Sequence, residues 1–358
     1  MRQASNFPCP QAIGGKDVGH DTRQTMEAWE NFLSGSGGRE CSSVRPMIHA
    51  SWERSVSSGV DWLGSDAPLY SEEEDIDLRR RHNADLLEAA RIPFTQLGKL
   101  LDTARAMLVL TDRDGVILET IGDARTLDDG REIHLEIGGI WNETAAGTNG
   151  IGTALWTGEP VFVHAAEHFC AGIKGWTCAG APVRDPIDDS VIGVVDLSGP
   201  TEIFRPHNTA LITAAAREIE ASLRSGYTIE RARLLETCLK SGYGRQPQSG
   251  LIILDRLGRI VLSRNAPRVL PVDGVERRVA VGQRLAHTAD TAGIDELSVA
   301  LAGDPQLSTI DAIHIGGVLR GYVLEFAPAS RTPCAIRRPL APAAPARIAR
   351  ERSEMPAV

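Results

Sequence analysis

Trp141-Asn-Glu-Thr-Ala-Ala-Gly-Thr-Asn-Gly-Ile-Gly-Thr-Ala-Leu155 carries more information about the fold than any other stretch of this chain. Its glycines do not have the Gly-x-Gly-x-x-Gly spacing of a dinucleotide-binding loop. The stretch is not a P-loop either, because no Gly-Lys-Ser/Thr follows it. It predicts a loop capped by Thr148 or Asn149 that leads into a short helix ending at Leu155. A glycine-rich turn needed only for packing is the alternative.

A second cluster follows in Glu167-His-Phe-Cys170 and Trp176-Thr-Cys-Ala-Gly-Ala-Pro182. His168, Cys170 and Cys178 can all bind metals, but their spacing is not that of a structural zinc site. Cys170 and Cys178 would form a redox pair if their Cα atoms approached to within about 7 Å. Inert packing or pocket lining is the alternative, since buried free cysteines behave as small hydrophobic residues.

On either side of these clusters the chain alternates between helical and strand patterns. Apolar runs around Gly115 and Gly258 predict two similar β-hairpins. Further strands are predicted at 310–315 and 319–326. Helices are predicted at 44–58, at 71–104 with Ser71 as N-cap and an interruption at Pro93, and at 208–239.

Composition narrows the class of protein. The 358 residues have a formal net charge of −9, which argues against a general nucleic-acid-binding surface. No apolar run is long enough for a spanning helix, and the N-terminus does not read as a secretory signal. Six cysteines are too sparse for a disulfide framework. We therefore expect a cytoplasmic protein that does not contact a membrane.

Many short motifs occur in the order typical of one known family. They are Ser51-Trp-Glu-Arg-Ser55, Gly59-Val-Asp61, Trp141-Asn-Glu143, Gly147-Thr-Asn149, Ile151-Gly-Thr153, Glu167-His-Phe-Cys170, Trp176-Thr-Cys178, Ala181-Pro182, Asp185-Pro186 and Asp196-Leu-Ser-Gly-Pro200. Over roughly residues 44–225 the chain resembles the sensory GAF domain of acetoin-catabolism-type activators, which work with sigma-54 polymerase. The hairpin that begins at Leu251 is similar to the PAS-like segment that often follows. The sequence has no Walker motif and no helix-turn-helix pattern after residue 326, so neither ATPase activity nor direct DNA binding is expected.

The resemblance and the patterns together predict an α+β fold, with a GAF domain of antiparallel sheet and flanking helices followed by a smaller PAS-like α+β domain. The expected division is a disordered segment at 1–43 with at most one helical turn, a helical region at 44–104, the GAF-like domain at 105–240, the PAS-like domain at 250–328, and a disordered Pro/Arg-rich tail at 329–358.

The resemblance also implies a binding pocket for a small metabolite of the alcohol or ketone type. Its expected apolar walls are Trp141, Phe169 and Trp176, and its expected polar groups are Asn142, Glu143, Asn149 and His168. Thr148, Cys170 and Cys178 complete the predicted set. For Trp141 and Trp176 the alternative is core packing, and for Glu143 it is a solvated loop carboxylate.

The expected function is regulation of a catabolic pathway, without a catalytic residue, metal or cofactor. The expected partner is a second copy of the chain or a full-length relative. Two other hypotheses remain: a redox or metal sensor that uses Cys170 and Cys178, and a thiol-dependent methionine sulfoxide reductase with Cys170 beside His168.

Overall fold

The computed structural model describes residues 22–35, 44–70, 73–203, 205, 207–285, 293–301 and 304–328. The predictions for the first 21 residues, for 36–43 and for the tail at 329–358 lie outside these described residues. The predicted N-cap Ser71 lies outside them as well.

A five-stranded antiparallel sheet organises the first half of the chain. Its strands are β1 (Met107–Asp112), β2 (Ile117–Gly122), β3 (Val161–His164), β4 (Trp176–Arg184) and β5 (Val191–Pro200), in the order β2-β1-β5-β4-β3. The predicted hairpin is confirmed as β1–β2. Its turn contains Gly115, whose φ of 80° is a backbone conformation that glycine adopts without strain.

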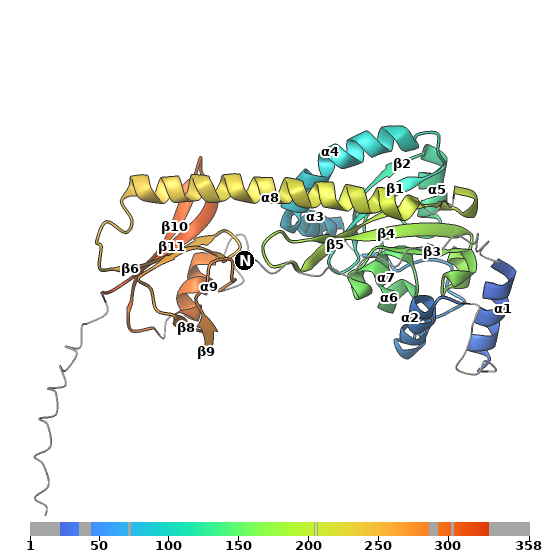
Figure 1. Ribbon diagram of the computed structural model, residues 1–358, viewed down its shortest axis with the longest axis horizontal. Coiled ribbons are helices and arrows are strands. Elements are labelled where there is room, and N and C mark those ends of the chain that lie inside the picture. Colours follow the sequence, from blue (N-terminus) through green and yellow to red (C-terminus); the bar gives the residue numbers. More distant parts are fainter. Residues whose placement is uncertain are drawn as a thin grey trace, which may run out of the picture.

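Side chains alternate across each strand, so apolar residues lie on both faces of this sheet. Helices cover both faces. On one face, Leu108 and Val195 pack against α4 (Ala84–Leu101) and α8 (Asn208–Ser241). On the other face, Val109 and Val194 belong to a core shared with α2 (Pro46–Ser57) and α7 (Gly150–Thr157). Figure 1 shows α4 and α8 on one side of the sheet and α2, α6 and α7 on the other. The remaining helical elements here are α1 (Thr22–Leu33), α3 (Glu73–His82), α5 (Ala124–Arg131), α6 (Glu143–Ala146), and the 3-10 turns η1 (Ala165–Glu167), η2 (Ala171–Ile173) and η3 (Thr201–Ile203).

A second, smaller α+β unit follows. Its four-stranded antiparallel sheet has the order β10-β11-β6-β7. The elements are β6 (Gly250–Asp255), β7 (Ile260–Arg264), β10 (Leu307–Ile315) and β11 (Val318–Phe326), with α9 (Gly293–Ala300) and the small ribbon β8 (Val269–Val272) and β9 (Val275–Arg278). The second predicted hairpin is therefore confirmed as β6–β7. It repeats the first turn, since Gly258 N–H bonds to Asp255 O as Gly115 N–H bonds to Asp112 O.

The 34-residue helix α8 links the two units (Figure 1). Ile212 and Ile219 near its start pack on the first sheet, whereas Leu234 and Cys238 near its end pack on the second. The α+β fold class predicted from the sequence is confirmed by these two antiparallel sheets and their helices.

Two local predictions are wrong. Pro93 does not interrupt α4, which runs unbroken through it with Pro93 and Phe94 both buried. A proline inside a helix costs about 3 kcal/mol, and burial of this helix face against the sheet offsets that cost. The N-terminal segment contains the 12-residue helix α1 instead of at most one turn. Trp29 anchors α1 through tertiary contacts that the polar local composition does not reveal. None of the helices among the described residues has the length and apolarity needed to cross a membrane.

Candidate functional site

A buried carboxylate, that of Glu143, joins α2 to the segment 141–155. Arg54 donates to it twice, from Nε to Oε2 over 2.6 Å and from Nη2 to Oε1 over 2.9 Å. The hydroxyls of Ser51 and Thr153 donate to Oε1 over 2.6 and 2.8 Å. The hydroxyl of Thr148 lies 2.7 Å from that of Ser51. We call Ser51, Arg54, Glu143, Thr148 and Thr153 the polar core.

Two asparagine caps hold this segment in place. Asn142 accepts from Ala145 N at the start of α6, and Asn149 accepts from Gly152 N at the start of α7. Asn149 also donates to the carbonyls of Trp141 and Gly147 over 3.0 and 2.8 Å. The predicted cap is therefore Asn149, while Thr148 bonds within the polar core. Glycine is required at 152, because a Cβ there would lie 2.6 Å from Glu143 N.

The aromatic residues expected as pocket walls belong to the hydrophobic core. Trp141 and Phe169 are buried, and Trp176 packs against the same cluster. The indole of Trp141 donates to His134 O over 2.9 Å, and that of Trp29 donates to Phe169 O over 3.0 Å. These contacts give the three side chains a packing role, and their assignment to a ligand pocket stays a prediction.

Both cysteines are buried free thiols. Burial raises the pKa of Cys170 to about 11. The pKa of Cys178 is raised further, mainly by burial and to a smaller extent by the nearby carboxylate of Asp196. Because the thiolate is the reactive form, these thiols are weak nucleophiles near neutral pH. Within the described ranges, no group of three or more His, Cys, Asp or Glu side chains could hold a metal ion.

Two of the buried polar atoms that lack a partner in the described part of the chain belong to His168 and Asp196. The ring of His168 bonds through Nδ1 to Ala165 O over 3.0 Å, but its Nε2 has no partner. Burial lowers the pKa of His168 to about 3, so the ring is neutral and Nε2 is an acceptor. Asp196 accepts from Ser198 at Oδ2 over 2.5 Å, but its Oδ1 has no partner. Burial raises the pKa of Asp196 to about 7.

The sequence prediction included His168 but missed Asp196 and Ser198. Asp196 stands alone inside the apolar run of β5, and a carboxylate in a buried strand is a signal that could have identified it. The register places Ser198 opposite Cys178, and their side-chain atoms are 3.1 Å apart. The predicted residue Cys178 therefore belongs to a cluster with Asp196 and Ser198, on the sheet face that α7 covers.

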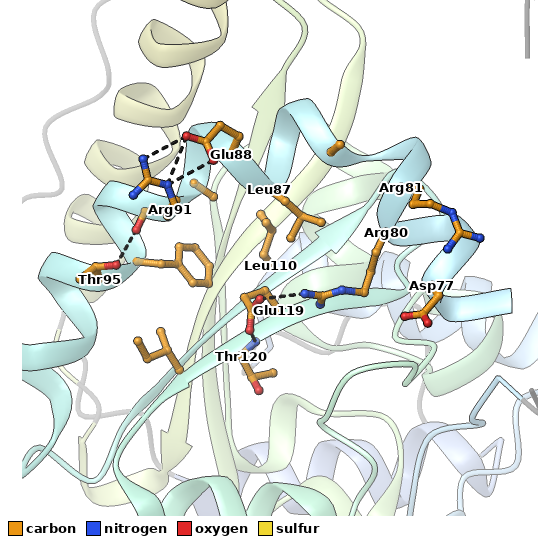
Figure 2. Close-up of a pocket in the computed structure, with 14 residues that line it drawn as sticks. Asp77, Arg80, Arg81, Leu87, Glu88, Arg91, Thr95, Leu110, Glu119 and Thr120 are labelled. Carbon is orange, nitrogen blue, oxygen red and sulfur yellow. Dashed lines mark hydrogen bonds and ion pairs between the residues drawn. The ribbon is translucent and has the colours of Figure 1, made fainter. Parts of the chain in front are cut away.

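The other face of the sheet has a cavity of about 700 Å³ between α3, α4 and the edge strand β2. Figure 2 shows its charged rim, where Arg80 pairs with Glu119 and Arg91 pairs with Glu88. Leu110 and Phe94 form part of its lining. None of the residues predicted from the sequence lines this cavity.

The five-stranded antiparallel sheet, covered by helices on both faces and followed by a second α+β unit, defines the GAF-like class of regulatory fold. The family described as "MimR, N-terminal domain" matches residues 21–221, more than half of the chain. The chain belongs to this family.

Curated relatives are similar over much of this chain. The "Propane 2-monooxygenase operon transcriptional activator MimR" of Mycolicibacterium goodii is 35% identical over 300 residues, which are 81% of this chain and 48% of the relative. The "Acetoin dehydrogenase operon transcriptional activator AcoR" of Bacillus subtilis is 29% identical over 243 residues, 68% of this chain and 39% of the relative. The chain thus spans less than half the length of each.

A solved structure supports the fold. The DhaR(N) part of the Escherichia coli DhaR(N)–DhaL complex is similar with a TM-score of 0.53 and 19% identity, covering 80% of this chain and 100% of that one. At this identity the likeness concerns the fold, and it includes both α+β units.

Proposed function

We propose that this chain is the effector-sensing region of a transcriptional regulator of a catabolic operon. Membership in the family described as "MimR, N-terminal domain" supports the regulatory part. The names of its relatives refer to operons for acetoin and propane oxidation. We propose that the effector of this chain is a small oxygenated metabolite, and that the chain senses it without catalysing a reaction.

The unpartnered buried atoms of His168 and Asp196 are the observation that carries this proposal. His168 Nε2 can accept a hydrogen bond from a hydroxyl, and Asp196 can accept one or, when protonated, donate one to a carbonyl. Leaving either atom unpaired costs about 1–3 kcal/mol, so a ligand that pairs with it gains affinity. Short-chain alcohols and hydroxyketones have the required groups and little charge.

The raised pKa values of both thiols favour this sensor over the redox and sulfoxide-reductase hypotheses. Self-association through the flanking helices, contact with a full-length relative and a cytoplasmic location stay predictions from the sequence.

Asp196→Asn tests the proposal, because it keeps the shape of the side chain but changes its hydrogen-bonding capacity. Ligand binding by the full chain is measured by calorimetry with acetoin, propan-2-ol and acetone. We expect binding of at least one compound, weakened about tenfold or more in Asp196→Asn, as the loss of one buried hydrogen bond to a charged or polar partner implies. Asp188→Asn is the control, since Asp188 is a more exposed carboxylate in the β4–β5 turn.

Two results would contradict this function: no heat of binding with any of the three compounds, or equal affinity in the wild type and Asp196→Asn. Trp141→Ala is less informative. Its buried indole is hydrogen-bonded to His134 O, so the variant would lose stability whether or not a ligand binds there.

A further inference from the structure

A cleft of about 590 Å³ lies between the two α+β units. Its walls come from the start of α4, the turns β1–β2 and β4–β5, the middle of α8 and the hairpin β6–β7. Small-molecule sites commonly have volumes of about 300–1,000 Å³ and occur preferentially at domain interfaces. The cleft therefore has the size and position of a ligand site, and it contains none of the residues proposed above as effector contacts.

The charge of the cleft is opposite to that of the chain. Seven arginines and five carboxylates line it, whereas the whole chain has a net charge of −9. Three arginines are paired across it: Arg259 with Asp185, Arg256 with Asp85, and Arg320 with Glu230. The first two pairs join the two units.

The two remaining carboxylates are also engaged. Asp255 accepts from the backbone amides of Leu257 and Arg259, each over 2.9 Å. Glu88 pairs over 3.0 Å with Arg91, which lines the cavity on the other side of α4. No carboxylate of the cleft is left for a further arginine.

Several guanidinium groups are nevertheless unpaired. Arg113, Arg231 and Arg233 line the cleft and have no ion pair among the described residues. Arg259 is 6% exposed, and its Nε lacks a hydrogen-bond partner in the part of the chain that the structure describes. A buried donor without an acceptor is costly. The cleft thus offers positive charge from α8, from the β1–β2 turn and from the second unit.

Apolar side chains complete the lining. Leu86, Ile187, Leu223 and Val261 lie beside the charged groups, together with the half-buried ring of Tyr227. An inorganic anion alone would leave this apolar surface uncovered, whereas an organic substituent would bury it.

We propose that the cleft between the two units binds a small organic phosphate. A phosphomonoester has a charge of about −1.5 to −2 at neutral pH, which matches the surplus of two arginines over carboxylates. Guanidinium groups bind phosphate oxygens in a fixed, often bidentate geometry. The ligand contacts both units and α8 at once, so its occupancy favours the packing of one unit on the other.

The test is calorimetric titration of the full chain with AMP, with inorganic phosphate and with adenosine. We expect saturable one-to-one binding of AMP, weaker binding of phosphate and none of adenosine. Arg231→Gln should weaken AMP binding about tenfold or more, because it removes one charge-assisted contact to phosphate. Arg217→Gln is the matched control, since Arg217 is an exposed arginine of the same helix that does not line the cleft.

Three results would overturn the proposal. One is that neither AMP nor inorganic phosphate binds to the wild type. Another is that adenosine binds as tightly as AMP, which would show that phosphate is not recognised. The third is that Arg217→Gln weakens AMP binding as much as Arg231→Gln does. Circular dichroism of both variants identifies any loss of folded structure.

Discussion

The polar core and the cleft between the units each contain an arginine bound to a carboxylate. In the polar core, Arg54 holds Glu143 with two hydrogen bonds, and two hydroxyls complete the shell of that carboxylate. In the cleft, Arg259 also donates twice to Asp185, but its Nε and three neighbouring arginines are left without a carboxylate. The two pairs are similar in geometry and differ in their surroundings.

That difference separates a structural ion pair from one with spare binding capacity. A buried pair stabilises a fold only when further hydrogen bonds satisfy its remaining atoms. The polar core meets this condition and fixes α2 on α6 and α7. The cleft does not meet it, because it has more donors than acceptors, and the imbalance leaves room for an anionic ligand.

The largest effect is expected from breaking the polar core with Glu143→Gln. The substitution removes the negative charge and leaves Arg54 partly buried without a counter-charge, so the free energy of unfolding should fall by about 3–5 kcal/mol. Chemical denaturation of the full chain measures it. Glu119→Gln is the control, because that more exposed partner of Arg80 should cost less than about 1 kcal/mol. Equal losses in the two variants would contradict the structural role of the polar core.

The next effect concerns a buried carboxylate that, unlike Glu143, has no arginine. The pKa of Asp196 is about 7 in the folded state against 3.8 as its ordinary value, so only the folded state keeps this proton between these values. Its contribution to stability is therefore fully present below about pH 4 and is lost as the pH rises through 7. Relative to Asp196→Asn, the wild type should lose up to about 1.4 kcal/mol per pH unit, about 2 kcal/mol between pH 5 and 7.

Unfolding of both proteins at several pH values measures this difference. His168 has the opposite effect, because its lowered pKa favours the folded state as the pH rises towards 6.5. Both the wild type and Asp196→Asn contain His168, so this effect cancels in their difference. A difference in stability that does not change with pH would show that Asp196 titrates normally.

The smallest of these effects is expected for Asp185→Asn in the cleft. It removes one counter-charge of Arg259, but the carboxylate of Asp188 still lies 3.8 Å from the same guanidinium, so the loss of stability should be about 1–2 kcal/mol, less than for Glu143→Gln. Hydrogen exchange of the β6 and β7 amides measures this loss of stability in the second unit. A loss as large as that of Glu143→Gln would mean that Asp188 does not compensate for the lost charge of Asp185.

Much of the fold was predictable because its signals are local. The strand patterns and turn glycines of both hairpins correctly predicted β1–β2 and β6–β7, and Asn149 was one of two proposed caps for α7. The errors concern elements held by distant contacts. Trp29 in α1 depends on a carbonyl 140 residues away, and Pro93 is tolerated because its helix is buried. Asp196 interrupts an apolar run, but its lack of a partner becomes visible only with the packing of α7 on β5.

The α+β class, the family and the order of the elements follow from the sequence, because periodicity, turn residues and motif order are properties of neighbouring residues. The roles of the charged residues depend on the tertiary structure. It gave Glu143 an arginine from α2, left Asp196 without one, and brought arginines from α8 and both units to one cleft. The energy of a charge depends on its burial and on the partners around it, and in this chain those partners come from distant segments.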